Sequence, residues 1–227
     1  MLASHTVENY LKAIYHVQST MAAAALVPMG QLASALGVVP GTATTMVKAL
    51  AESGLVKYEP YAGVRLTSAG EKLAALVLRR HRLIELFLVK VMGMSWAEVH
   101  DEAERLEHAV SDELIARMAR ALGDPSFDPH GAPIPTAEGD IDETELASLA
   151  EAPVGSDVVL RQVNDDDAAV LRYLAEQGLT PGVRLRVTGR QPFNGPTIVD
   201  LAGVARIIGH ELAATLRCEP LRPEEVR

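Results

Sequence analysis

The residues best suited to chemistry lie between positions 99 and 110, where histidines and carboxylates follow one another closely. On an α-helix of about 3.6 residues per turn, His100, Glu104, Glu107 and His108 share one arc beside an apolar stripe. These side chains are therefore expected at the edge of a core. Clustered carboxylates are costly to desolvate unless a cation compensates them. The pattern predicts a bound metal ion.

A further pair of ligand-type residues is expected on the preceding helix. His81 and Glu85 are four residues apart and share a helix face, which antiparallel packing would bring to His100. A solvated face is the ordinary explanation for a run of charges, but three histidines and three glutamates with almost no cations among them favour metal binding. Imidazole and carboxylate without thiolate suit Mn²⁺ or Fe²⁺ better than a structural Zn²⁺. Cys218 is the only cysteine, which excludes a disulfide within the chain.

The N-terminal segment is expected to fold as a winged helix-turn-helix. Apolar spacing predicts a first helix, then helices over 31–36 and 41–52 joined by a turn at Gly37, then a hairpin of strands 55–59 and 63–67. The last helix of such a unit enters the major groove of DNA. A small helical packing module is the alternative. The side chains expected to contact DNA are Pro40, Thr42, Thr44, Thr45 and Lys48 on the third helix, and Lys57 and Arg65 on the hairpin.

The charge distribution allows this DNA-binding role although the whole chain carries −9. Residues 1–70 contain four Lys or Arg and three Glu, a local balance of +1, so the remainder carries −10. No apolar run approaches the roughly 20 residues that a membrane span needs, and the N-terminus lacks the features of a signal peptide. The chain is therefore expected to be cytoplasmic, with no membrane partner.

The rest of the chain predicts a helical domain and a small β module. Two helices are expected over 68–122, and the first of them is apolar on more than one face, which fits a homodimer interface. A linker rich in Pro, Gly and Asp precedes strands at 157–160, 183–187 and 197–201, with a short helix over 167–177. The expected fold is mainly α with small β parts. The expected domains are a winged helix (1–67), a helical metal-binding and dimerisation domain (68–145) and an SH3-like β-barrel (155–219).

At several of these motifs the chain resembles the diphtheria toxin repressor family, including its manganese-transport-regulator branch. The most specific matches are residues 80–85 and 100–108, Leu106-Glu107-His108 followed by residues 110–113, and a linker-like segment at 128–135. The resemblance covers almost the whole chain. It implies a metal-dependent repressor that binds double-stranded operator DNA as a homodimer, with metal-uptake genes as targets. It implies no enzymatic activity and no small-molecule substrate.

The resemblance also implies two metal sites. The regulatory site would use Glu104, Glu107 and His108 with a first-helix ligand, either Asn9 or the neighbouring Glu8. The second would use His81, Glu85 and His100, with Asp166 as the candidate acid from the C-terminal module. In the iron-sensing branch a cysteine stands at the position of Glu104, so the glutamate here favours Mn²⁺, with Fe²⁺ as the alternative. Lys12 replaces an acid of some manganese regulators, so a binuclear site is not expected.

Two other functions remain open at the level of sequence. The same histidines and glutamates could build a metallohydrolase, although no base or nucleophile stands out beside them. A metal-independent winged-helix regulator could instead use the charged face to bind a protein partner.

Overall fold

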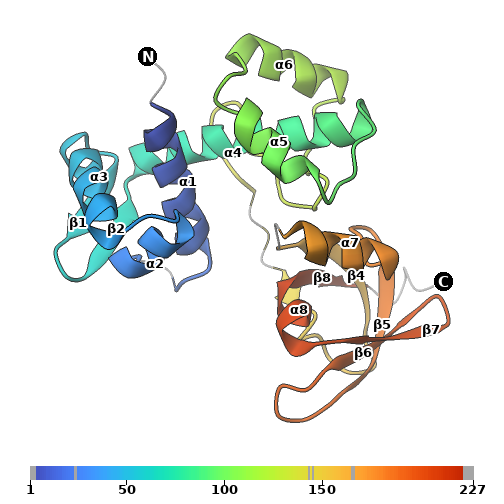
Figure 1. Cartoon of the computed structure of the whole chain (residues 1–227). Helices are drawn as coiled ribbons and strands as arrows, with labels where there is room; N and C mark the ends of the chain where they lie inside the picture. The colour runs from blue at the N-terminus through green and yellow to red at the C-terminus, as the bar shows by residue number, and fades with distance from the viewer. Residues whose placement is uncertain (1–3, 23–24, 143, 145, 165–166, 222–227) are drawn as a thin grey trace. The chain divides into compact units, whose positions relative to one another are not determined.

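The computed structural model describes residues 4–22, 25–142, 144, 146–164 and 167–221 (Figure 1). The chain forms two compact units. The first holds residues up to His81 with 107–109 and 135–141, and the second holds the remaining residues. Among the described ranges, no helix has both the length and the hydropathy of a membrane span. The fold is mainly helical with small β parts, and the predicted division into three domains stays a prediction.

The first unit contains a winged helix-turn-helix, as the sequence predicts. Its elements in chain order are α1 (His5–Ser19), α2 (Met29–Ala35), α3 (Pro40–Glu52), β1 (Val56–Glu59), β2 (Gly63–Leu66) and the first part of α4 (Ser68–Lys90). The side chain of Ser4 caps α1 by accepting a hydrogen bond from Val7 N, and Pro40 occupies the first turn of α3. The two strands pair antiparallel, with Val56 opposite Leu66.

The core of the first unit joins the three helices to the hairpin. It is built from buried apolar side chains of every element, among them Leu11, Ile14, Leu32, Val47, Leu50, Val64 and Leu66. Because α1 shares this core with α3, a displacement of α1 would disturb the packing of the expected recognition helix.

The helical part of the second unit corrects one expectation. Beyond the end of α4 it contains α5 (Val99–Leu106) and α6 (Asp112–Ala121). The sequence predicted one helix running through Val110, but α5 ends at Leu106 and a turn follows. Ser111 is the physical reason for the new start, because its extended backbone caps α6 and its side chain accepts from Leu114 N. Leu114, in the first turn of α6, is 45% exposed.

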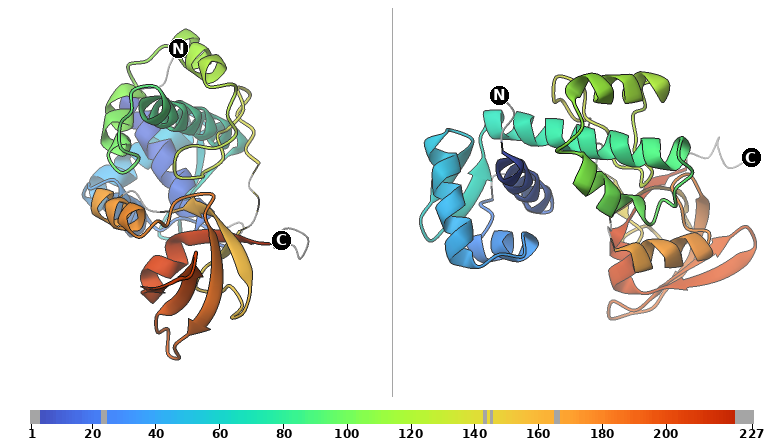
Figure 2. Two further views of the ribbon diagram at one scale, coloured as in Figure 1. Left: turned by 90° about the vertical axis from the view of Figure 1, so that its right-hand side faces the viewer. Right: turned by 45° about the horizontal axis from the view of Figure 1, so that its top comes forward.

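The C-terminal part of the second unit is an SH3-like module with one antiparallel sheet. Its elements are β3 (Ala147–Ser148), β4 (Asp157–Val163), α7 (Ala168–Glu176), β5 (Arg184–Arg190), β6 (Thr197–Leu201), β7 (Val204–Ile208), α8 (His210–Thr215) and β8 (Leu216–Pro220). The strand order is β3-β8-β4-β5-β6-β7. Helix α7 packs on the core of this module through Leu171 and Leu174 (Figure 2).

The predicted strands at β4, β5 and β6 and the predicted helix α7 are confirmed, but β7, α8 and β8 were not foreseen. The short β8 buries only its first and third residues, and it pairs with β4 and β3, which are far away in sequence. Strand β8 continues to Pro220, which pairs with Val158. Residues 222–227 lie outside the described residues.

Helix α4 lies very close to Leu55, the residue before β1, and this contact provides a test of the packing of the first unit. A Cβ atom on Gly70 would lie 2.0 Å from the carbonyl oxygen of Leu55. Gly70→Ala should therefore lower the free energy of unfolding by about 1–3 kcal/mol, because the backbone must shift to relieve the overlap. Chemical denaturation measures this change. Gly30→Ala, on α2 with nothing within 4 Å, is the control and should be neutral or stabilising. Equal effects of the two substitutions would contradict the close contact.

Candidate metal centre

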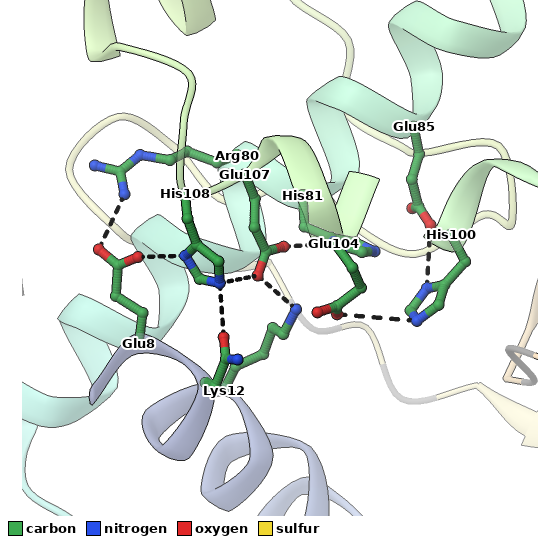
Figure 3. A network of polar contacts seen from close by, with 10 residues as sticks. Glu8, Lys12, Arg80, His81, Glu85, His100, Glu104, Glu107 and His108 are labelled. Carbon is green, nitrogen blue, oxygen red and sulfur yellow. Dashed lines mark hydrogen bonds and ion pairs between the residues drawn. The ribbon is translucent and has the colours of Figure 1, made fainter. Parts of the chain in front are cut away.

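The first network of polar contacts gathers around His108 in the turn that follows α5 (Figure 3). Its Nδ1 lies 2.7 Å from Glu8 Oε2, and its Nε2 lies 2.7 Å from Asn9 Oδ1. Glu107 Oε1 is 3.3 Å from the same Nε2. The ring of His5 stacks on that of His108 with centroids 4.6 Å apart. The sequence left the first-helix ligand open between Asn9 and Glu8, and both side chains contact His108.

Glu107 is the most deeply placed acid of this network, with 1% of its surface exposed. Its Oε1 accepts a hydrogen bond from Lys12 Nζ at 2.8 Å, and its Oε2 lies 2.6 Å from His81 Nδ1. Burial raises the pKa of Glu107, but the hydrogen bond with His81 and the positive charge of Lys12 together outweigh it, so the net shift is downward. The carboxylate is therefore ionised at neutral pH.

Glu8 is the second buried acid, 2% exposed, and Arg80 Nη1 lies 3.3 Å from its Oε1. Glu8 and Lys12 are one turn apart on α1, so both project from the same side of that helix. In the sequence, Lys12 stood out only as the loss of an acid, and Arg80 had no predicted role. The sequence offered one hint for each residue: Lys12 lies one helical turn after Glu8, and Arg80 directly precedes His81. Ion pairs between residues 72 or more positions apart leave no periodic pattern in a sequence.

This arrangement offers the donors of a hard-cation site. Glu8, Glu107 and His108, with the amide oxygen of Asn9, supply two carboxylates, one imidazole and one neutral oxygen without a thiolate. Such a set suits Mn²⁺ or Fe²⁺. Each of the two buried carboxylates lies beside a lysine or arginine side chain, so this position in the structure accommodates positive charge. A divalent ion could replace that compensation.

The second unit holds a separate group of ligand-type residues. Glu85 on α4 is 2% exposed, and its Oε1 lies 3.5 Å from His100 Nδ1. Glu104 Oε1 lies 3.9 Å from His100 Nε2 (Figure 3). The structure thus places Glu104, which the sequence grouped with Glu107, beside His100. His81, which the sequence grouped with Glu85, belongs to the first unit and contacts Glu107. Asp166 lies outside the described residues.

The expected DNA-contact residues lie on the surface of the first unit. Pro40, Thr42, Thr45, Lys48 and Lys57 are exposed, whereas Thr44 and Arg65 are half-buried. The hydroxyls of Thr44 and Thr45 donate to the carbonyl oxygens of Pro40 and Gly41 at 2.8 and 3.0 Å. Their contact with DNA stays a prediction.

Comparison with known families places each part of the chain. Residues 2–64 match the N-terminal DNA-binding domain of iron-dependent repressors, and residues 67–136 match the metal-binding and dimerisation domain of the same proteins. Residues 147–220 match the FeoA domain.

Whole-length relatives agree with this order of domains. The iron-dependent repressor IdeR of Mycobacterium tuberculosis is 32% identical, over 94% of this chain and 96% of that protein. The diphtheria toxin repressor of Corynebacterium glutamicum is 30% identical over the same shares. Among solved structures, a manganese-dependent transcriptional repressor in complex with manganese matches with 38% identity and a TM-score of 0.87, over 95% of this chain and all of that chain. ScaR with bound Zn²⁺ matches with 32% identity and a TM-score of 0.81, over 95% and 99%.

The contact between Lys12 and Glu107 predicts competition between the ammonium group and a metal ion. Lys12→Met should tighten Mn²⁺ binding by about tenfold, or ~1.4 kcal/mol, because Glu107 is then freed for the ion. Isothermal titration of chelator-treated protein measures the dissociation constant. Lys48→Met, an exposed change on α3, is the control and should leave the constant as it is. Weaker binding in Lys12→Met would show that the lysine assists the ion rather than competing with it.

Proposed function

The chain belongs to the diphtheria toxin repressor family of metal-dependent, DNA-binding transcriptional repressors, and from that membership we propose that Mn²⁺ activates it. The observation that carries the proposal is the convergence of Glu8, Asn9, Glu107 and His108 within one unit. Oxygen ligands with one imidazole favour a hard divalent ion. Cys218, the only thiol, is buried in the C-terminal module, where it packs with the apolar core. Fe²⁺ is the alternative metal.

The proposed regulatory site has His108 and Glu107 as ligands from the turn after α5 and Glu8 and Asn9 as ligands from α1. Glu104 remains a predicted ligand of this site. The proposed second site uses Glu85 and His100, while His81 and Asp166 remain predictions for it. A divalent ion, when bound, would supply the positive charge that these buried carboxylates need.

The residues of the chain convert this binding into control of DNA affinity. Glu8 and Asn9 hold α1 to the turn at 107–109, and α1 shares its core with α3. The position of α1 therefore constrains the helix that is proposed to enter the major groove. Metal can shift the equilibrium between two arrangements only by its different affinity for them, typically about 1–3 kcal/mol.

The proposed partners are double-stranded operator DNA and a second copy of the chain. Support comes from the exposed face of α3 and from the near-neutral charge of residues 1–70 in an acidic protein. Two copies would present two recognition helices to half-sites about one DNA turn apart, or a multiple of it. Genes of metal uptake are the proposed targets.

The central test is whether metal controls DNA binding. Chelator-treated protein is titrated with Mn²⁺, anaerobic Fe²⁺ or Zn²⁺ while fluorescence anisotropy follows binding to the DNA upstream of its own gene. Mn²⁺ should tighten binding by about 5- to 150-fold. Glu107→Gln and His108→Ala should abolish this gain, because each removes a ligand.

Glu113→Gln is the matched control, because Glu113 is an exposed acid paired with Arg117 on α6. It should keep the full response to Mn²⁺. DNA affinity that is equal with and without metal would reject the proposal and leave a metal-independent regulator.

A second test concerns the recognition helix itself. Lys48 is exposed on α3 and is expected to contact a phosphate. Lys48→Ala should weaken binding to all DNA sequences alike and reduce the salt slope of the binding constant by about 1. Anisotropy at several salt concentrations measures the slope, with Lys90→Ala on α4 as the control. An unchanged slope would remove Lys48 from the DNA interface.

A further inference from the structure

The wing strand β2 is attached to the rest of the first unit along both of its edges. Strand β1 covers one edge, with Val56 opposite Leu66. On the other edge, Val27 N donates to Val64 O at 2.8 Å, and Val64 N donates to Val27 O at 3.0 Å. Two residues further along this second edge, Leu66 N donates to the side-chain Oε1 of Gln18 in α1 at 3.1 Å.

The amide oxygen of Gln18 therefore takes the place that a residue of a neighbouring strand would occupy. The backbone N–H groups of Val64 and Leu66 point to the same edge of β2, because the two residues are two positions apart in a strand. The segment that contains Val27 satisfies the first of these groups, and helix α1 satisfies the second. A partly buried N–H group without an acceptor is costly, so this contact ties the wing to α1.

Leu66 also lies next to a junction that holds the end of α3. Thr67 N donates to Leu55 O at 3.0 Å, and Thr67 Oγ1 donates to Gly54 O at 2.8 Å. Both acceptors lie directly after the end of α3. The same Oγ1 accepts a hydrogen bond from Gly70 N, in the first turn of α4, at 3.2 Å. The backbone around Leu66 thus joins the wing strand, the end of α3 and the start of α4.

Helix α1 connects this junction to the proposed regulatory metal site. Its first turns contact the turn at 107–109, and Gln18 lies in its last turn. Asn9 and Gln18 are about 14 Å apart along the helix axis, at 1.5 Å per residue. We infer that Gln18 is a positioning residue that couples the position of α1 to the wing and to the end of the recognition helix. The inference rests on the proposed function, because it assigns Gln18 a part in metal-dependent DNA binding.

A hydrogen bond constrains the wing more sharply than the apolar core does. Apolar contacts have no preferred direction, whereas a hydrogen bond requires a narrow range of distance and angle. A displacement of α1 by about 1 Å would stretch the bond between Gln18 and Leu66 beyond that range unless Leu66 followed. The side chain of Leu66 is buried in the core of the first unit, so its backbone moves together with its neighbours.

Substitutions of Gln18 separate the hydrogen bond from the shape of the side chain. Gln18→Met keeps an unbranched side chain of similar length and removes the acceptor, whereas Gln18→Glu keeps an acceptor oxygen. Gln31→Met is the matched control, because Gln31 is an exposed glutamine on α2. Circular dichroism and thermal unfolding check that each variant is folded. Gln18→Ala also lacks the acceptor and replaces Gln18→Met if that variant does not fold.

The first measurement contains no DNA. Hydrogen–deuterium exchange of the full-length, chelator-treated protein is followed with and without Mn²⁺ in the peptide that contains residues 63–67. Mn²⁺ should slow this exchange in wild type, Gln18→Glu and Gln31→Met, because α1 then holds the N–H group of Leu66 more firmly. The slowing should disappear in Gln18→Met. Isothermal titration should give the same affinity for Mn²⁺ in all four proteins, because Gln18 contacts none of the proposed ligands.

The second measurement is DNA binding by fluorescence anisotropy with and without Mn²⁺. The gain in DNA affinity on addition of Mn²⁺ should be about 2- to 10-fold smaller in Gln18→Met than in wild type, the range that one net hydrogen bond represents. Gln18→Glu and Gln31→Met should keep the full gain.

Two results would overturn the inference. In one, Gln18→Met keeps both the slowing of exchange and the full gain in DNA affinity. In the other, Gln18→Met binds DNA more weakly by the same factor with and without Mn²⁺, which would limit Gln18 to stabilising the fold. Failure of the proposed function has a different signature, because wild type itself would then gain no DNA affinity from Mn²⁺. The exchange measurement would still decide whether Gln18 couples α1 to the wing.

Discussion

Two carboxylates that are almost fully buried, those of Glu8 and Glu107, must be compensated by positive charge, and the organisation of the first unit depends on that requirement. In the structure Arg80 and Lys12 provide the charge, with imidazole rings on both acids. A buried ion pair contributes little net stability, because the cost of desolvating both charges offsets their attraction. A divalent cation can therefore replace the lysine or arginine as the partner of these carboxylates. This makes the network suitable for sensing a metal, because the ion exchanges with contacts that already exist and does not have to create a new pocket.

The same network connects the proposed metal ligands to the predicted DNA-binding surface. Helix α1 has two faces: Glu8, Asn9 and Lys12 meet the turn at 107–109, while Leu11 and Ile14 are buried in the core that α3 shares. A close-packed core transmits displacement instead of absorbing it. A change at the polar face of α1 must therefore alter the packing beneath the expected recognition helix, which is how a repressor of this family can respond to metal.

The second unit also buries two carboxylates close together. Glu85 and Asp128 are buried together, and Arg82 approaches Asp128 only to 3.7 Å. The histidines beside them, His100 and His130, can each donate or accept, so they do not settle the charge of the pair by themselves. The loop of Asp128 and His130 is also hydrogen-bonded to β4. The loop that carries these two residues thus connects the helical part of this unit to the SH3-like module.

The sequence by itself determined the winged helix, the helical segments, the β-rich C-terminal module and the set of histidines and acids from which most of the proposed metal ligands come. These features follow from local rules: apolar spacing, turn residues and the types of donor atoms. Only the tertiary structure decided that α5 ends at Leu106, that Glu8 and Asn9 both reach His108, and that His130 turns its Nδ1 towards Glu85. The pairing of β8 with β4 and the contact of Lys12 with Glu107 belong to the same class. Each joins residues far apart in the chain, and the compensation of buried charge depends on distances in space that sequence spacing does not contain.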